Sequence, residues 1–382
     1  MGCRVIVQAF LRWSEKAGSS DRAKAAKALG QAYLQASLPE DRHASAYAAM
    51  TCLLDDPSPK VRLALAESLA HAADAPRAII IALAEDQPEI ACPVILNSPV
   101  LREADLVELV GRGGPIARAM VAARPGLTPG ICAALAEVGE ECEISILLEN
   151  RFVTVTPFTL RRIAQRFSTI PGIRSLLLDH HELPADVRHA LVLEVGAALE
   201  MAGIVFHVIA PARAQRLVRE ASDAATTLIA GEVRGTEAPV LVEHLRQQSA
   251  LTPAFLMHVL CLGKLDFFAE AISNLSGLDE PRVRSILATG RQHAVKALYQ
   301  SAGIFGVVLE VFMEATLLWR GAADIPYGGA VSQVTAKLIR RFSPVECDGT
   351  LQEILSMVER LHIAEQRNRA RTLATDLVAD AA

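Results

Sequence analysis

Apolar residues recur along this chain at intervals of three and four, the spacing that places them on one face of an α-helix. Val61, Leu65 and Leu69 are the clearest example. The sequence DDPSP at residues 55–59 precedes them and ends an earlier helix, because proline lacks the N–H group that a helix interior needs. The stretch therefore predicts two helices joined by a tight turn. Such a hairpin cannot bury both of its faces alone, so it needs a similar neighbour.

The same hairpin pattern returns about every thirty residues. Pro59, Pro88 and Pro115 each follow an acidic or glycine-rich turn and each begins an apolar helical stretch. Pro93 lies inside the second of these stretches, so we expect that repeat to be the shortest and most bent. Self-similarity at this period is typical of an α-solenoid, in which each repeat buries its face against the next. The prediction is an all-α protein with a solenoid over residues 1–165, a second helical domain over 166–345 and an amphipathic helix over 346–382.

The last of these segments carries an apolar stripe formed by Leu351, Ile354, Leu355, Val358 and Leu361. A stripe of this kind either docks on the body of its own chain or pairs with a second copy. Both alternatives stay open, and the second would make the protein a homodimer through its C-terminal helix.

Composition and charge narrow the function classes. Apolar residues make up 51% of the chain but aromatic residues only 4%, which suits closely packed helices. The formal charge of −5 argues against a general nucleic-acid binder, although it leaves room for a local basic face. Glu310 and Glu314 interrupt the most apolar run, residues 302–319, so we expect a buried helix there and no contact with a membrane.

The cysteines point to a reducing compartment. There are seven, an odd number, and no two of them form a CxxC pair. Most lie in apolar helical stretches, so we expect buried free thiols. Since Arg12 and Glu15 follow the N-terminal apolar run without a cleavage site, we also expect no secretory signal and a cytoplasmic location.

Five segments of the chain carry a further pattern: DDPSPKVRLALAESLA, LAEDQPEIACPVILNSPVL, DLVELV, ARPGLTPGICAAL and, later, LCLGKLDFFAEAISNLSGLDEPRVRSIL. Together they resemble one bacterial family, domain of unknown function 2336. The part from Leu53 to Leu135 is the most specific, and the resemblance covers most of the chain. It implies HEAT-like helical repeats in the first half. It implies no activity and no catalytic residues.

The densest group of potential metal ligands is Asp179, His180, His181 and Glu182, with His189 further along. Two adjacent histidines on a turn do not easily face one ion, and a helical site needs ligands four residues apart. We therefore expect a solvated turn rather than a metal site. No GxGxxG, Walker, GxSxG or HExxH motif occurs, so we expect no catalytic residues, no cofactor and no bound metal.

Residues 266–291 allow two interpretations. A small residue, then Gly277 four residues later, then an aliphatic residue is the pattern of a DNA-binding helix-turn-helix. Its second helix would carry Arg282, Arg284 and Arg291, of which the last two would share a face. Any αα-hairpin with a glycine turn gives the same pattern, and Asp279 and Glu280 dilute the positive charge.

Together these observations predict a cytoplasmic, non-catalytic scaffold or regulatory adaptor that binds an unidentified protein partner. One alternative is a transcriptional regulator that uses the hairpin at 266–291. Another is a HEAT-like nucleic-acid-modifying enzyme, which would need a basic groove with exposed aromatic side chains and a carboxylate. The candidate interaction surface consists of Arg62, Arg118, Arg282, Arg284 and Arg291.

Overall fold

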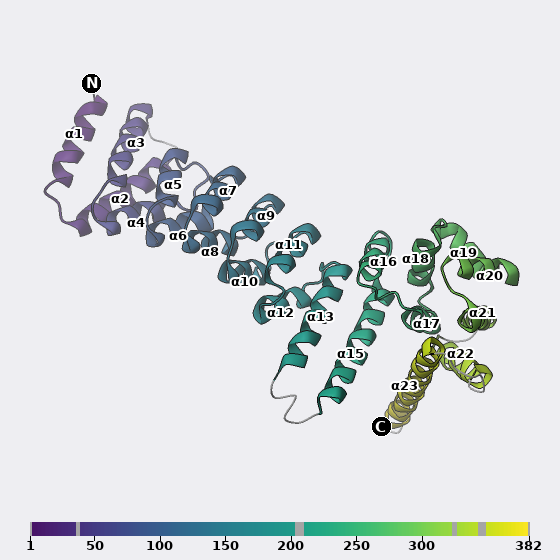
Figure 1. Cartoon of the computed structure of the whole chain (residues 1–382). Helices are drawn as coiled ribbons and strands as arrows, with labels where there is room; N and C mark the ends of the chain where they lie inside the picture. The colour runs from purple at the N-terminus through teal and green to yellow at the C-terminus, as the bar shows by residue number, and fades with distance from the viewer. Residues whose placement is uncertain (1, 36–38, 203–209, 323–326, 343–348, 381–382) are drawn as a thin grey trace. The chain divides into compact units, whose positions relative to one another are not determined.

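A computed structural model describes residues 2–35, 39–202, 210–322, 327–342 and 349–380. These residues form twenty-two α-helices and, within the described ranges, no strand (Figure 1). The prediction of an all-α fold is therefore confirmed. The chain divides into two compact units, Met1–Leu183 and Pro184–Ala382.

The first unit is a two-layered row of helical hairpins. The odd-numbered helices form one layer, in which α1 packs on α3, α3 on α5, α7 on α9 and α9 on α11. The even-numbered helices from α2 to α12 form the other layer, each packing on the next. This consecutive packing is solenoid-like. The helices are α1 (Gly2–Ser14), α2 (Ser19–Tyr33), α3 (Glu40–Leu54), α4 (Pro59–Leu69), α5 (Arg77–Ala84), α6 (Pro88–Asn97), α7 (Glu103–Arg112), α8 (Pro115–Ala123), α9 (Pro129–Val138), α10 (Glu141–Glu149), α11 (Pro157–Phe167) and α12 (Pro171–Asp179).

The hairpin of α3 and α4 forms as its sequence predicts. Helix α3 ends at Leu54 and α4 begins with Pro59 in its first turn. Between them, Asp56 accepts a hydrogen bond from the Ser58 N–H group at 2.8 Å, which fixes the turn. Leu65 is completely buried, as are the other members of its apolar face, Val61 and Leu69. The expected register of this repeat is therefore confirmed.

Paired arginine and aspartate side chains connect neighbouring hairpins. Arg22 in α2 donates to Asp56, with 2.7 Å between Nε and Oδ2, and Arg62 in α4 donates to Asp86 at 2.6 Å. In both pairs a second guanidinium nitrogen binds the other carboxylate oxygen. Bidentate pairs of this kind are directional, so they fix the offset between repeats as well as stabilising it.

The repeat that contains Pro93 consists of α5, with 8 residues, and α6, with 10. That this repeat is the shortest and most bent stays a prediction. Pro93 removes one internal hydrogen bond. The helix continues because Ile90 and Val94, on either side of the proline, are buried against α4, α5 and α8.

The second unit is a helical domain built around α17, which packs on α15, α18, α21, α22 and α23. Phe268, Tyr299 and Phe312 form an aromatic cluster in its core, with ring centroids 5.5 to 6.4 Å apart. Its helices are α13 (Ala185–Met201), α15 (Pro211–Glu232), α16 (Glu237–Gln247), α17 (Pro253–Cys261), α18 (Leu265–Ser276), α19 (Glu280–Thr289), α20 (Gln292–Ser301), α21 (Gly306–Gly321), α22 (Tyr327–Phe342) and α23 (Gly349–Asp380).

The C-terminal helix docks on the second unit. The stripe residues Leu351, Ile354 and Val358 are buried, and α23 packs on α17 and α22. Of the two alternatives drawn from the sequence, docking on the same chain therefore describes this stripe.

The boundary between the two compact units falls after Leu183. The division at residues 165 and 345 that the sequence suggests stays a prediction.

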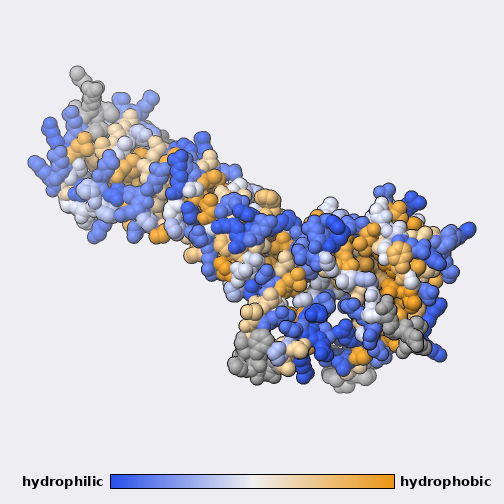
Figure 2. Space-filling view, viewed as in Figure 1, coloured by the Kyte–Doolittle hydropathy of each residue, from blue (hydrophilic) through white to orange (hydrophobic). Residues whose placement is uncertain are grey.

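The face of the molecule shown in Figure 2 carries many hydrophilic side chains, with apolar residues exposed between them. Among the described helices, none combines the length and the apolar character required to span a bilayer. The expectation of buried thiols holds only in part. Cys132 and Cys261 are buried, and burial raises their pKa to about 11 and about 12, but Cys52 and Cys142 lie on exposed helix faces.

Candidate functional site

The first unit contains a groove where the regular packing of its helices is interrupted. Helix α5 does not pack extensively on α7, although α7 packs closely on α9 and the even-numbered layer continues without a break. The resulting space, the α5–α7 groove, has a volume of about 670 Å³ and is lined by α5, α7 and the starts of α6 and α8. A space of this size accepts several side chains of a ligand.

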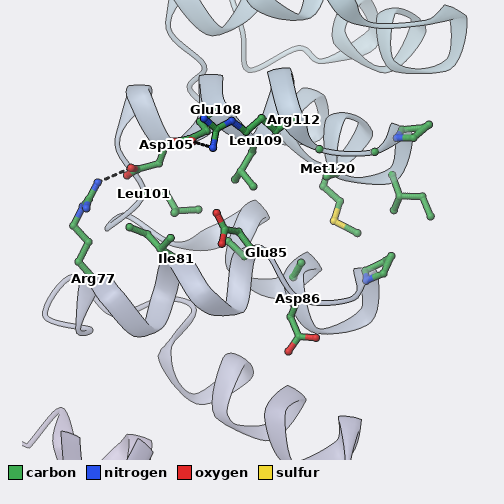
Figure 3. Close-up of a pocket in the computed structure, with 18 residues that line it drawn as sticks. Arg77, Ile81, Glu85, Asp86, Leu101, Asp105, Glu108, Leu109, Arg112 and Met120 are labelled. Atoms are coloured by element: carbon green, nitrogen blue, oxygen red, sulfur yellow. Dashed lines mark hydrogen bonds and ion pairs between the residues drawn. The ribbon is translucent and has the colours of Figure 1, made fainter. Parts of the chain in front are cut away.

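The floor and one rim of the α5–α7 groove are apolar. Leu101, in the connection before α7, is buried at the bottom, and Ile81 and Leu109 face the space from opposite helices (Figure 3). Met120 and Ile116 extend this surface along α8, where the side chain of Ile116 is 55% exposed. Such an exposed aliphatic side chain beside a concave apolar surface is typical of an interaction site.

Charged side chains surround the apolar floor. Arg77 at the start of α5 forms an ion pair with Asp105 of α7 across one end of the groove (Figure 3). Arg112 pairs with Glu108 within α7, with 2.7 Å between Nη1 and Oε1. Glu85, at the C-terminal end of α5, makes no ion pair among the described residues and is exposed.

The fourth carboxylate of the groove, that of Asp86, already forms an ion pair with a residue outside the groove. Asp86 binds Arg62, which does not line the space. Burial raises the pKa of Asp86, but hydrogen bonds from Arg62 and from the Gln87 N–H group outweigh this effect and leave the pKa below its ordinary value. The groove is therefore lined by four carboxylates and two guanidinium groups, and Glu85 is the acidic group without a partner in the described structure.

The structure places the five arginines of the candidate interaction surface in both units. Arg62 and Arg118 lie in the first unit, where both also bind backbone carbonyl groups. Arg62 donates to the Asp56 carbonyl oxygen, and Arg118 donates to that of Val110 at 2.9 Å. These two arginines thus stabilise the repeats, and a role in binding a partner stays a prediction.

The other three arginines lie in or beside the hairpin of α18 and α19. Gly277 adopts a left-handed conformation, φ 70°, which only glycine adopts without strain, and this residue ends α18. Arg284 forms ion pairs with Asp266 and Glu280, and Arg282 is exposed on the same helix. The expectation that Arg291 shares a face with Arg284 is wrong. Helix α19 ends at Thr289, and Arg291 is the N-cap of α20.

The histidine-rich segment forms a turn. The Glu182 N–H group donates to His180 Nδ1 at 3.2 Å, and the rings of His180 and His181 stack with centroids 5.2 Å apart. The Nδ1 atom of His180 therefore accepts a backbone hydrogen bond within the turn. Across the described chain, His, Cys, Asp and Glu residues form no group of three or more with the geometry to hold a metal ion.

The α5–α7 groove was not predicted from the sequence. The periodic pattern predicts that consecutive repeats pack alike, and nothing in the spacing indicates that one pair of helices separates. One local feature is related to the groove. The sequence Asn97-Ser98-Pro99 ends α6 and begins a connection in which Leu101 lines the space between α5 and α7.

The fold and the groove define a helical protein with a solenoid-like first unit and an open, acid-rimmed cavity between two of its hairpins. The chain belongs to the family described as uncharacterised protein conserved in bacteria, DUF2336, whose model matches residues 90–352. The match begins in α6, at the edge of the groove, and ends in α23. No curated protein and no solved structure matches the chain.

Proposed function

We propose that this protein is a non-catalytic scaffold or adaptor, and that the α5–α7 groove binds a segment of a partner protein. The observation that carries the proposal is the separation of α5 from α7 within an otherwise regular layer. A repeat protein that only needed stability would close this gap, because packed helices bury more apolar surface. The separation leaves Ile81, Leu109 and Ile116 available to a ligand.

The charges of the groove define the partner's chemistry. Carboxylates outnumber guanidinium groups, and Glu85 has no ion pair among the described residues. A segment with one apolar anchor and an adjacent lysine or arginine would bury the anchor between Ile81 and Leu109 and pair its cation with Glu85. Complementary charge of this kind contributes specificity and association rate more than affinity.

The two alternative functions, a nucleic-acid-modifying enzyme and a transcriptional regulator, have less support. A modifying enzyme would need a basic groove with aromatic side chains, and the residues that line the α5–α7 groove include no aromatic residue within the described chain. A regulator would need arginines that reach DNA, whereas Arg284 is already paired with two carboxylates.

Photocrosslinking in the native cell tests the proposal. A benzoylphenylalanine placed at Ile116 should yield one dominant crosslinked protein, and the crosslinked segment should contain an aliphatic residue next to a basic one. The control position is Val240, which is also exposed but lies in the second unit. Equal products at both positions, or none at Ile116, would contradict a binding role for the groove.

A further inference from the structure

The second unit contains its own cavity, between α13, α15, α17 and α23, with a volume of about 600 Å³. We call it the four-helix cavity. Its apolar wall includes Leu193, Phe255, Met357 and Leu361. Its polar groups are His189, Arg219, Glu220, Asp223, His258, Glu353 and Arg360, together with smaller hydroxyl and amide side chains. All of these residues belong to one compact unit.

His258 lines this cavity. Its Nδ1 lies 3.3 Å from the hydroxyl oxygen of Thr227, and that hydroxyl already donates its hydrogen to the Asp223 carbonyl oxygen at 2.8 Å. The hydroxyl can therefore only accept from the ring, so Nδ1 carries the proton and Nε2 is an acceptor. Burial, and then the charge of Arg360, lower the pKa of His258 to about 4, which keeps the ring neutral at pH 7.

His189 also makes a contact within the protein through its Nδ1 atom. The residue is 2% exposed and lines the cavity. Its Nδ1 lies 3.1 Å from Nε2 of His244, while its own Nε2 has no hydrogen-bond partner among the described residues. Burial and the neighbouring His244 lower the pKa of His189 to about 4. Two neutral imidazoles thus line the cavity, each with its Nδ1 atom in contact with another side chain of the protein.

The charged groups of the cavity are mostly acidic. Arg360 of α23 pairs with Glu220 of α15 at 2.6 Å. Asp223 and Glu353 have no ion pair within the described residues, and Arg219 is the remaining cation. Burial raises the pKa of Asp223, and so do Glu353 and Glu220, although Arg219 and Arg360 act in the opposite direction. Asp223 and Glu353 are exposed residues of the cavity lining, so a cation that arrives with a ligand can pair with them.

We propose that the four-helix cavity binds an organic ammonium ion with an apolar body. An ammonium group has three donors and no acceptor, which matches the carboxylates of Asp223 and Glu353 and the Nε2 lone pair of His258. The apolar body would lie against Phe255 and Met357. An anion would meet the surplus of carboxylates, and a purely apolar molecule would offer no donor to Asp223, Glu353 or His258.

Calorimetry on the full chain tests the charge that the cavity prefers. The probes are hexylammonium, 1-hexanol and hexanoate, which share one apolar chain and differ in the head group. We expect hexylammonium to bind at least tenfold more tightly than either of the others. Equal binding of 1-hexanol, stronger binding of hexanoate, or no binding of hexylammonium up to 10 mM would overturn the proposal.

Two variants and one control assign the site. Asp223→Asn and Glu353→Gln should each weaken hexylammonium binding, the first at least tenfold, while Glu310→Gln, on an exposed position of α21, should leave it unchanged. In protein labelled with ¹³C-methyl methionine, hexylammonium should shift the Met357 signal and not that of Met50, which is buried in the first unit. A Met357 signal that does not move would place the binding elsewhere and contradict the proposal, whatever the variants do.

Discussion

At the scale of single residues, several side chains stabilise this protein by donating to carbonyl groups at helix ends. The last turn of a helix leaves carbonyl oxygens without partners inside the helix. Arg124 donates to the carbonyl oxygens of Ile95 and Ser98, both at 2.6 Å, and Asn150 donates to those of Ala122 and Arg124 at 2.9 Å. Each contact joins one repeat to the preceding one, so the side chain acts both as a cap and as a link between hairpins.

The register of the first unit depends on Leu65. We expect Leu65→Ala to lower the free energy of unfolding by about 2–5 kcal/mol, because the side chain is fully buried and its removal leaves a cavity. Leu11→Ala, on an exposed position of α1, is the matched control and should change stability by less than about 0.5 kcal/mol. Urea unfolding measures both. Equal effects of the two substitutions would mean that the assigned register is wrong.

The buried histidines make the second unit sensitive to acid. His189 and His258 have a pKa of about 4 in the folded state, below the ordinary value of 6.5, so the unfolded chain binds protons first as the pH falls. Their contribution is present above pH 6.5 and is lost between pH 6.5 and 4, by at most about 3 kcal/mol for each histidine. Asp223, whose pKa is raised, acts in the opposite direction.

A variant isolates the histidine contribution. His258→Asn should unfold with a weaker pH dependence between pH 7 and 4.5 than the unsubstituted protein. Thermal unfolding followed by circular dichroism at a series of pH values measures this slope. The same slope in both proteins would show that His258 does not titrate with a lowered pKa.

At the scale of elements, local chemistry predicts helix starts well and helix neighbours poorly. Thr128-Pro129 and Thr252-Pro253 both begin helices as N-cap and first residue, and the Thr252 hydroxyl accepts from the Phe255 N–H group at 3.1 Å. Such helix starts are encoded in a few adjacent residues. In contrast, the carbonyl groups that accept hydrogen bonds from Arg124 lie 26 and 29 residues away in the sequence, so no local pattern predicts them.

One side chain of α21 binds the C-terminal end of α19. Arg320 donates to the carbonyl oxygens of Ile286, Leu287 and Gly290 at 2.6 to 2.7 Å, which caps the C-terminal end of α19. We expect Arg320→Met to cost about 2–4 kcal/mol and to speed amide exchange in α19. Arg320→Lys should rescue only part of this loss, because an ammonium group cannot reproduce the guanidinium geometry. Unchanged exchange in the Met variant would show that other contacts hold α19.

The hairpin of α18 and α19 provides the test that separates adaptor from regulator. With Arg284 paired to Asp266 and Glu280, we expect duplex DNA to bind no more tightly than about 10⁻⁵ M at physiological salt. Fluorescence anisotropy with random and genomic duplexes measures this. Nanomolar, sequence-selective binding that Arg284→Ala abolishes would favour the regulator instead.

At the scale of the whole molecule, the two units carry two different cavities. The α5–α7 groove exposes apolar side chains beside Glu85, and the four-helix cavity is lined by two neutral histidines and by Asp223 and Glu353. None of these three carboxylates forms an ion pair within the part of the chain that the structure describes. The sequence predicts the all-helical architecture and much of the core, since both follow from periodicity. It does not predict either cavity, because each depends on how far apart helices lie. In the second unit, α23 begins at Gly349 and completes a wall whose other helices begin much earlier in the chain, at Ala185, Pro211 and Pro253.

If the α5–α7 groove binds a partner segment through apolar and acidic contacts, then reversing the charge of its acidic rim should weaken binding. The most direct measurement is the affinity of the segment crosslinked at Ile116, as a labelled synthetic peptide, for the full chain and two variants. We predict that Glu85→Lys weakens binding at least tenfold, or about 1.4 kcal/mol, and that Glu310→Lys, in the second unit, leaves it unchanged. Equal affinity of the Glu85→Lys variant and the unsubstituted protein would contradict the account.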